Sequence, residues 1–164
     1  MRGIKNLDKN ATSSFLKGPK ITCSLLIPSE LIRKLSQSER KNLGKNIDFL
    51  LKRYGKKFRI NQKINQNALT IKYQKAGNSL IKINSRILPE EWATLSILAS
   101  AHGISRCFLY CILLQIFISD RSKAYSKMHP YIPSLKIESF IWSMDLKTKT
   151  IKRIFYQENS FDFL

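Results

Sequence analysis

Apolar and polar residues alternate along KITCSLLIP, residues 20–28. This period of two predicts a β-strand with one buried face. The tripeptide Pro-Ser-Glu at 28–30 then favours a helix start, because proline suits the first turn and the helix dipole favours an acid there. We expect a short helix in ELIRKLSQSERKN, a break at Leu43–Gly44, and a second helix in KNIDFLLKRY that ends at Gly55.

The same order of elements follows further along the chain. LIKINSRI, residues 80–87, alternates like a strand, and a proline-led helix is predicted over 89–101, closed by His-Gly at 102–103. Ser105 is a suitable N-cap for a further helix over 105–118. That helix is apolar on nearly every side, so another part of the protein must cover its second face.

Two other regions carry strand patterns. ALTIKYQ, residues 68–74, is followed by the turn-like KAGNS, and together with the next strand it predicts a hairpin over 69–87. In the tail, IESFIWSMDLKTKTIKRIFYQ predicts a hairpin that turns at 147–149. We expect the tail to cover the apolar helix, with Trp142 and Phe155 as its anchors.

The two strand-helix-helix stretches align with each other. With Pro28 placed over Pro89, the alignment runs for 27 positions without a gap. Leu43 then falls on Ile104, and other apolar positions of the two second helices coincide. Either the chain contains an internal repeat or two helix pairs resemble each other by chance.

The first stretch joins ITCSLLIPSELIRKL to LGKNIDFLLKRY, and the second joins IKINSRILPEEWATLSILA to GISRCFLYCILL. Strand, helix and helix of this length resemble the unit of the ribbon-helix-helix DNA-binding fold. The resemblance implies an α+β chain, mainly α with short β, in which two such units form a pseudo-dimer. Their strands would pair antiparallel into a ribbon, and four helices would make the core. Whether the units pair within one chain or between chains is left open.

On this interpretation the chain has five segments. They are a flexible basic arm at 1–19, a first unit at 20–55, a linker with a hairpin strand at 56–80, a second unit at 81–118, and a C-terminal extension at 119–164 that packs on the second unit and adds a β-hairpin.

YQKAGNSLIK, the run PEEWATLSILASAHGISRC and the apolar helix after it resemble a further family, the DUF1564-like proteins abundant in leptospiral genomes. This similarity covers roughly residues 20–155. Because the family carries a domain-of-unknown-function label, it implies little about activity.

Charge narrows the classes of partner. The chain has 29 Lys and Arg against 11 Asp and Glu, a formal net charge of +18. Residues 1–86 hold 20 basic and 4 acidic side chains, whereas residues 87–164 hold 9 and 7. Such an excess favours a polyanion, and nucleic acid first. A solvated basic surface and an anionic membrane surface are the alternatives.

In the ribbon-helix-helix fold the outward strand side chains read base edges in the major groove. The predicted base-contacting residues are the polar members of the two strands: Lys20, Thr22, Ser24, Lys82, Asn84 and Arg86. Arg86 suits guanine and Asn84 suits adenine. Leu26 ends the outward set of the first strand.

The register of the second strand has an alternative. Counting back from Pro89, as the resemblance suggests, would turn Ile83, Ser85 and Ile87 outward, and a one-residue bulge before Leu88–Pro89 would reconcile the two counts. We predict the polar set, because the slip would bury Lys82 and Arg86. A hairpin whose polar face is merely solvated is the other interpretation.

The starts of the two second helices are predicted to contact phosphate, because free backbone N–H groups and the helix dipole suit an anion there. The residues concerned are Gly44, Lys45, Asn46, Ser105 and Arg106. A purely structural capping role for Gly44 and Ser105 is the alternative.

Catalysis and cofactors are not expected. The glutamates at 90–91 adjoin in a first helical turn, and the sequence contains no phosphate loop, dinucleotide fingerprint or Ser-His-Asp arrangement. Cys107 and Cys111 lie four residues apart, but two histidines and no carboxylate cluster do not complete a zinc site. With Cys23 they are expected to be buried as small apolar residues.

The sequence thus predicts a cytoplasmic, sequence-specific double-stranded DNA-binding protein, a transcriptional regulator that is not an enzyme, has no cofactor, does not span a membrane and self-associates. An antitoxin is one subclass. The alternative is a protein-interaction or RNA-binding module with a basic surface. The sequence does not reveal the operator, any effector or the regulated genes.

Overall fold

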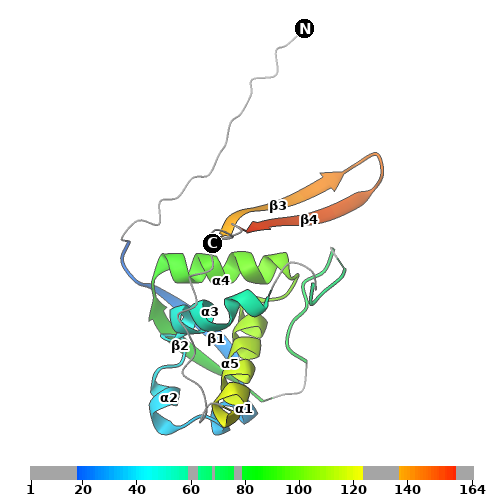
Figure 1. Ribbon diagram of the computed structural model, residues 1–164. Coiled ribbons are helices and arrows are strands. Elements are labelled where there is room, and N and C mark those ends of the chain that lie inside the picture. The colour runs from blue at the N-terminus through cyan, green and yellow to red at the C-terminus, as the bar shows by residue number, and fades with distance from the viewer. Residues whose placement is uncertain (1–17, 59–62, 68, 76–78, 124–136, 158–164) are drawn as a thin grey trace, which may run out of the picture.

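The computed structural model describes residues 18–58, 63–67, 69–75, 79–123 and 137–157 (Figure 1). Within them the chain is mixed α+β, with helices that pack over one two-stranded antiparallel sheet and a second two-stranded sheet near the C-terminal end. Nearly all of the predicted basic arm at 1–19 lies outside the described residues.

The first sheet joins two strands that are far apart in the sequence. β1 (Ile21–Pro28) pairs antiparallel with β2 (Leu80–Ile87), from Ile21 opposite Ile87 to Pro28 opposite Leu80. The two strands therefore pair within one chain, which confirms that the alternating segments lie side by side. Their alternation supplies one apolar face, which packs on the helices.

The predicted hairpin over 69–87 is wrong. Residues 69–75 form no strand, and their one bridge in the described chain is parallel, between Lys72 and Ile104. The backbone N–H of Lys72 donates to the Gly103 carbonyl at 2.9 Å, and its carbonyl accepts from the Ser105 N–H at 2.9 Å. The backbone of Lys72 is thus bonded at the junction between two helices, while β2 pairs with β1.

The first unit contains more helical pieces than predicted. α1 (Ser29–Arg33) and α2 (Gln37–Lys41) replace the single helix, and α3 (Ile47–Tyr54) continues into a short 3-10 helix, Gly55–Lys57. The break has a local cause. Ser36 starts α2 in a capping box, with its hydroxyl accepting from the Glu39 N–H and the Glu39 carboxylate accepting from the Ser36 N–H.

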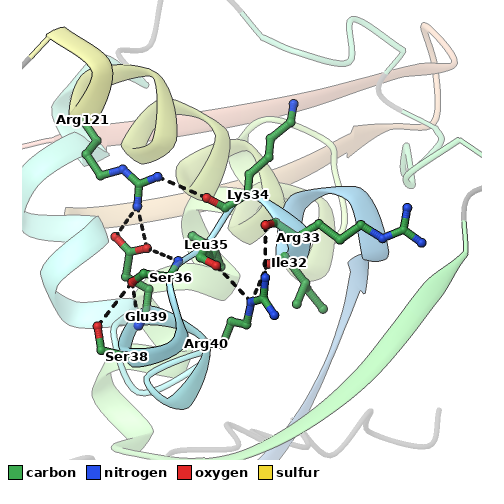
Figure 2. A network of polar contacts seen from close by, with 9 residues as sticks. All are labelled: Ile32, Arg33, Lys34, Leu35, Ser36, Ser38, Glu39, Arg40 and Arg121. Atoms are coloured by element: carbon green, nitrogen blue, oxygen red, sulfur yellow. Dashed lines mark hydrogen bonds and ion pairs between the residues drawn. The ribbon is translucent and has the colours of Figure 1, made fainter.

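Figure 2 shows a polar network that fixes this break. The Arg121 guanidinium donates to both carboxylate oxygens of Glu39, at 2.9 and 2.6 Å, and to the Lys34 carbonyl at 3.1 Å. Arg40 donates to the carbonyls of Ile32 and Leu35. Residue 121 lies in the longest helix of the second unit, so the network joins the two units at the surface.

The electrostatics of Glu39 follow from this network. Partial burial opposes ionisation, but the hydrogen bonds from Ser36 and the nearby Arg121 charge outweigh it, so the pKa of Glu39 lies below its usual value. The carboxylate is therefore stabilised in its ionised form.

The second unit consists of α4 (Pro89–Ala101) and α5 (Arg106–Lys123). α5 extends five residues beyond the predicted end at 118. Gly103 joins the helices with φ of +64°, a left-handed conformation that glycine adopts without strain. The Ser105 hydroxyl accepts from the Phe108 N–H at 3.1 Å, which confirms it as the N-cap of α5.

Both units contribute to one hydrophobic core. Leu25 and Ile27 of β1, Leu50 of α3, Leu98 of α4 and Leu113 of α5 are each at most 1% exposed and belong to the same buried cluster. α5 contacts α1, α3, α4 and β1. The second face of the apolar helix is therefore covered mainly by the first unit. Units this short need to pack together in order to bury enough apolar surface.

In the described part of the tail, the hairpin packs on α4, whereas the prediction placed the tail on α5. β3 (Ile137–Asp145) and β4 (Thr150–Gln157) form the expected hairpin and contact α4, on the side away from α5 (Figure 1). The Trp142 side chain is 64% exposed, so its predicted anchoring role is wrong. The side chain of Phe155 lies outside what the structure describes.

Candidate nucleic-acid interface

The outer face of the β1–β2 ribbon carries three cross-strand pairs. Thr22 lies opposite Arg86, Ser24 opposite Asn84, and Leu26 opposite Lys82. All six side chains are exposed, while the intervening residues of β1 are buried or half-buried. Five of the six are polar or charged, so this face combines hydrogen-bonding groups and positive charge on a surface two strands wide. Lys20 is exposed and directly precedes β1.

The register of β2 is the predicted one. Ser85 and Ile87 are 6% and 2% exposed, and Ile83 is half-buried, whereas the side chains between them are exposed. The pairing runs without a shift, so the proposed bulge is absent from this sheet. The extra residue lies after the strand instead: α1 begins directly after Pro28, whereas Leu88 separates the end of β2 from α4.

The central pair is joined by its side chains. The Ser24 hydroxyl donates to Asn84 Oδ1 at 2.7 Å. Such a bond orients the amide, so that its NH₂ group is directed away from Ser24. An asparagine amide presents a donor and an acceptor together, which is the pattern that adenine matches in the major groove.

The outer edge of β1 at Leu26 is covered by α5 and by Gln74 of the linker. The Leu26 N–H donates to Cys107 Sγ at 3.5 Å, and its carbonyl accepts from the Gln74 amide at 2.9 Å and from the Cys111 thiol at 3.6 Å. Covering this edge satisfies backbone groups that would otherwise be open to a further strand. The face of the ribbon stays exposed while this edge is closed.

The cysteines serve packing in the described chain. Cys23 and Cys111 are buried, as predicted, and Cys107 is half-buried against β1. Burial raises the pKa of Cys111 to about 11, although the Gln74 hydrogen bond opposes the shift, so this thiol is neutral at pH 7. Among the residues described, no group of three potential metal ligands occurs.

The turn before α3 lies against β2. Gly44 has φ of +79°, and a Cβ at this position would collide with the Cβ of Ser85. Both the backbone conformation and the close approach therefore require glycine. The turn at 44–46 is thereby held beside the ribbon, where Lys45 is exposed.

Tyr110 of α5 supplies the bond that holds this turn. Its buried hydroxyl accepts from the Gly44 N–H at 2.8 Å and donates to Asn46 Oδ1 at 2.7 Å. Burial raises the pKa of Tyr110 well above its usual value, so the hydroxyl keeps its proton. Two of the predicted phosphate contacts, Gly44 and Asn46, thus already bond within the protein, and Lys45 is the exposed member of the three.

The start of α5 lies near the opposite edge of the ribbon. The Arg106 guanidinium lies 4.4 Å from the centre of the Trp92 ring and donates to the Ser96 hydroxyl at 3.4 Å. Ser105 and Arg106 line a surface groove of about 470 Å³ that Ser24 of β1 also lines. Arg106 is therefore an exposed cation held at the side of the ribbon.

Sequence reasoning did not identify Tyr110, Cys107 or Gln74 as residues that position this face. One signal was available for Tyr110, because a tyrosine within an apolar helix needs a partner for its hydroxyl when it is buried. The contacts of Cys107 and Gln74 are with the backbone of a strand far away in the sequence, and no local pattern indicates them.

A family model described as protein of unknown function (DUF1564) matches residues 4–162. The chain belongs to this family. The match covers both strand-helix-helix units and the C-terminal hairpin, so all of these elements lie within the family region. The comparisons found no match among the curated proteins or the solved structures.

A helix that crosses a bilayer needs about 20 mostly apolar residues. In the described part of the chain, no helix combines the length and the apolar character needed to cross a membrane.

Proposed function

We propose that this protein binds double-stranded DNA in a sequence-specific manner and acts as a transcriptional regulator by occupying its operator. One observation carries the proposal. β1 pairs with β2, and the exposed face of this ribbon carries five polar or charged residues: Thr22, Ser24, Lys82, Asn84 and Arg86. The major groove admits a two-stranded β-ribbon and shows a different donor and acceptor pattern for each base pair.

The proposed arrangement is a ribbon-helix-helix pseudo-dimer within one chain. β1 is followed by α1 to α3 and β2 by α4 and α5, and the helices of both units share one core. In this arrangement the ribbon enters the groove, and the helices hold its two strands in register. The closed outer edge of β1 supports this mode, because the ribbon then offers its face and not that edge.

Phosphate contacts would come from the sides of the ribbon. Lys45 precedes α3 beside β2, and Arg106 begins α5 near β1, so an exposed cation lies beside each edge. These contacts would position the protein without specifying sequence. The net charge of +18 supports strong general attraction to DNA. We expect several chains to assemble on repeated sites.

A second candidate is an interaction module for an acidic protein or RNA. The observation that favours it is a row of exposed apolar side chains at 69–73: Leu69, Ile71 and Tyr73 are 73%, 55% and 64% exposed. Exposed aromatic rings stack on unpaired bases, and exposed apolar residues bind protein surfaces.

Selection from random duplexes distinguishes these candidates. The full chain is incubated with a randomised duplex pool at about 0.15 M salt, and the enriched sequences are then compared with random duplex during a salt titration. We expect a defined motif whose preference persists after salt removes general binding. Binding that never develops a sequence preference would contradict the proposal and favour the second candidate.

A further inference from the structure

We propose that one chain reads a DNA site without dyad symmetry, because the two strands of its ribbon present different side chains in a fixed order. This inference rests on the proposed function and specifies the class of target. A ribbon made by two identical chains presents the same residues from both strands and therefore matches a palindrome. Here both strands belong to one chain and differ at every outward position.

The asymmetry is defined by the central pair. The three outward pairs are Thr22–Arg86, Ser24–Asn84 and Leu26–Lys82, so Ser24–Asn84 lies in the middle. A two-fold rotation about this pair would exchange Thr22 with Lys82, Ser24 with Asn84 and Leu26 with Arg86. None of these exchanges relates identical residues. The outward face therefore has two distinguishable ends.

The two ends have different chemistry. At one end Arg86 offers a planar fork of donors that matches guanine O6 and N7. At the other end Leu26 is 40% exposed and offers an apolar contact of the kind that a thymine methyl group accepts. Leu80, 40% exposed at the start of β2, lies on the same face of that strand as Lys82 and extends the apolar surface at that end. The site would thus have one end read by Arg86 beside Thr22 and another read by Lys82 beside the apolar Leu26.

The flanking cations are unlike as well. Lys45 belongs to a turn held by Tyr110, whereas Arg106 stacks on Trp92. Lysine acts as a flexible point charge, and a stacked arginine has a fixed orientation. Because one chain supplies all of these residues, the two edges of its ribbon always carry different cations.

Three forms of the full chain test the inference by selection from duplexes with about 10 randomised base pairs, one helical turn. The first is the wild type. The second carries Thr22→Lys, Ser24→Asn and Leu26→Arg, which makes the outward sets of both strands identical. The third is the matched control and also carries Lys82→Thr, Asn84→Ser and Arg86→Leu, so that the strands exchange their sets and every cross-strand pair is kept.

We expect the wild type and the exchanged control to enrich the same non-palindromic core, and the symmetrised variant to enrich a palindrome. The wild type should prefer the non-palindromic core at least about tenfold over the palindrome, and the symmetrised variant should show the reverse preference. Sedimentation of the wild-type complex should give one chain per site.

A palindromic core for the wild type, or an unchanged core for the symmetrised variant, would overturn the inference while leaving DNA binding intact. No enriched sequence from any form would instead overturn the proposed function. If like charges across the strands unfold the symmetrised variant, the reverse variant decides: Lys82→Thr, Asn84→Ser and Arg86→Leu alone also make the strands identical and should select a different palindrome.

Discussion

Arg86 and Lys45 are both exposed cations, but they lie on different surfaces of the molecule. Arg86 is on the outer face of the ribbon, opposite Thr22, whereas Lys45 is in the turn beside the ribbon edge. In the proposed complex the first reads a base and the second contacts phosphate. Their loss should therefore have different consequences for specificity and for salt dependence.

Replacing Arg86 with alanine should weaken binding to the selected motif by about 1–3 kcal/mol and relax the preference at one base pair. Lys45→Ala should weaken all duplexes alike and lower the salt slope by about 1. Lys147→Ala is the control, since it removes the same charge from the exposed turn of the C-terminal hairpin. Binding constants measured at several salt concentrations check all three. Equal losses on random and selected duplexes for Arg86→Ala would argue against base reading.

For individual residues, the alternation of apolar and polar positions predicted which strand side chains are outward. A period of two divides a strand into two faces, whatever its partner is. The predicted polar set of β2 is exposed for this reason. The bonds of Gly44 and Asn46 to Tyr110 could not be predicted in the same way. They join residues more than sixty positions apart, and only the packing of α5 against the first unit brings them together.

Among the elements, the contact between α5 and the turn before α3 links the two units through the Tyr110 hydroxyl. Tyr110→Phe keeps the ring but leaves the buried Gly44 N–H and Asn46 Oδ1 without this partner. We expect a loss of about 1–3 kcal/mol in the free energy of unfolding. Tyr73→Phe is the matched control, because Tyr73 is 64% exposed. Denaturant titration of both variants provides the measurement. A loss no larger for Tyr110→Phe than for Tyr73→Phe would show that the link contributes nothing.

The link between α2 and α5 should depend on pH. Because the pKa of Glu39 is lower in the folded chain, its ionised carboxylate stabilises the fold at neutral pH. This contribution is complete above the usual value of 4.5 and is lost as the pH falls through the lowered pKa. Glu39→Gln should cost about 0.5–1 kcal/mol at pH 7, and the difference from wild type should shrink in acid.

Unfolding measured from pH 7 down to pH 3 tests the Glu39 link, with Glu30→Gln as a control for an exposed acid in the first turn of α1. A difference between wild type and Glu39→Gln that stays constant over this range would contradict the assigned ionisation.

The elements themselves were predictable where the pattern is local. The proline-led helices, the Ser105 cap and the C-terminal hairpin all follow from residues next to one another in the chain. The break between α1 and α2 had a signal in Ser36 and Glu39, whose spacing is that of a capping box. Residues 69–75 show the opposite case, because their alternation suggested a strand while the backbone of Lys72 bonds to the α4–α5 junction.

For the whole molecule, the decisive feature is that β1 with its following helices and β2 with α4 and α5 pack around one core within one chain. Neither unit is large enough to bury an adequate core alone, so the need for pairing was predictable from length and apolar content. The sequence left open whether the partner lies on the same chain. The sequence also suggested that the tail covers α5. Its pattern showed that an apolar face of this helix needs a cover, but it did not show that the first unit supplies the cover.

The central claim is that the outer face of β1 and β2 reads bases from the major groove. Methylation interference on the selected duplex tests this most directly, because dimethyl sulfate modifies guanine N7 in the major groove and adenine N3 in the minor groove. For the wild type we predict interference at guanine N7, and for Arg86→Ala we predict that one guanine becomes insensitive while the others remain. Interference confined to adenine N3, or an identical pattern in both proteins, would contradict the account.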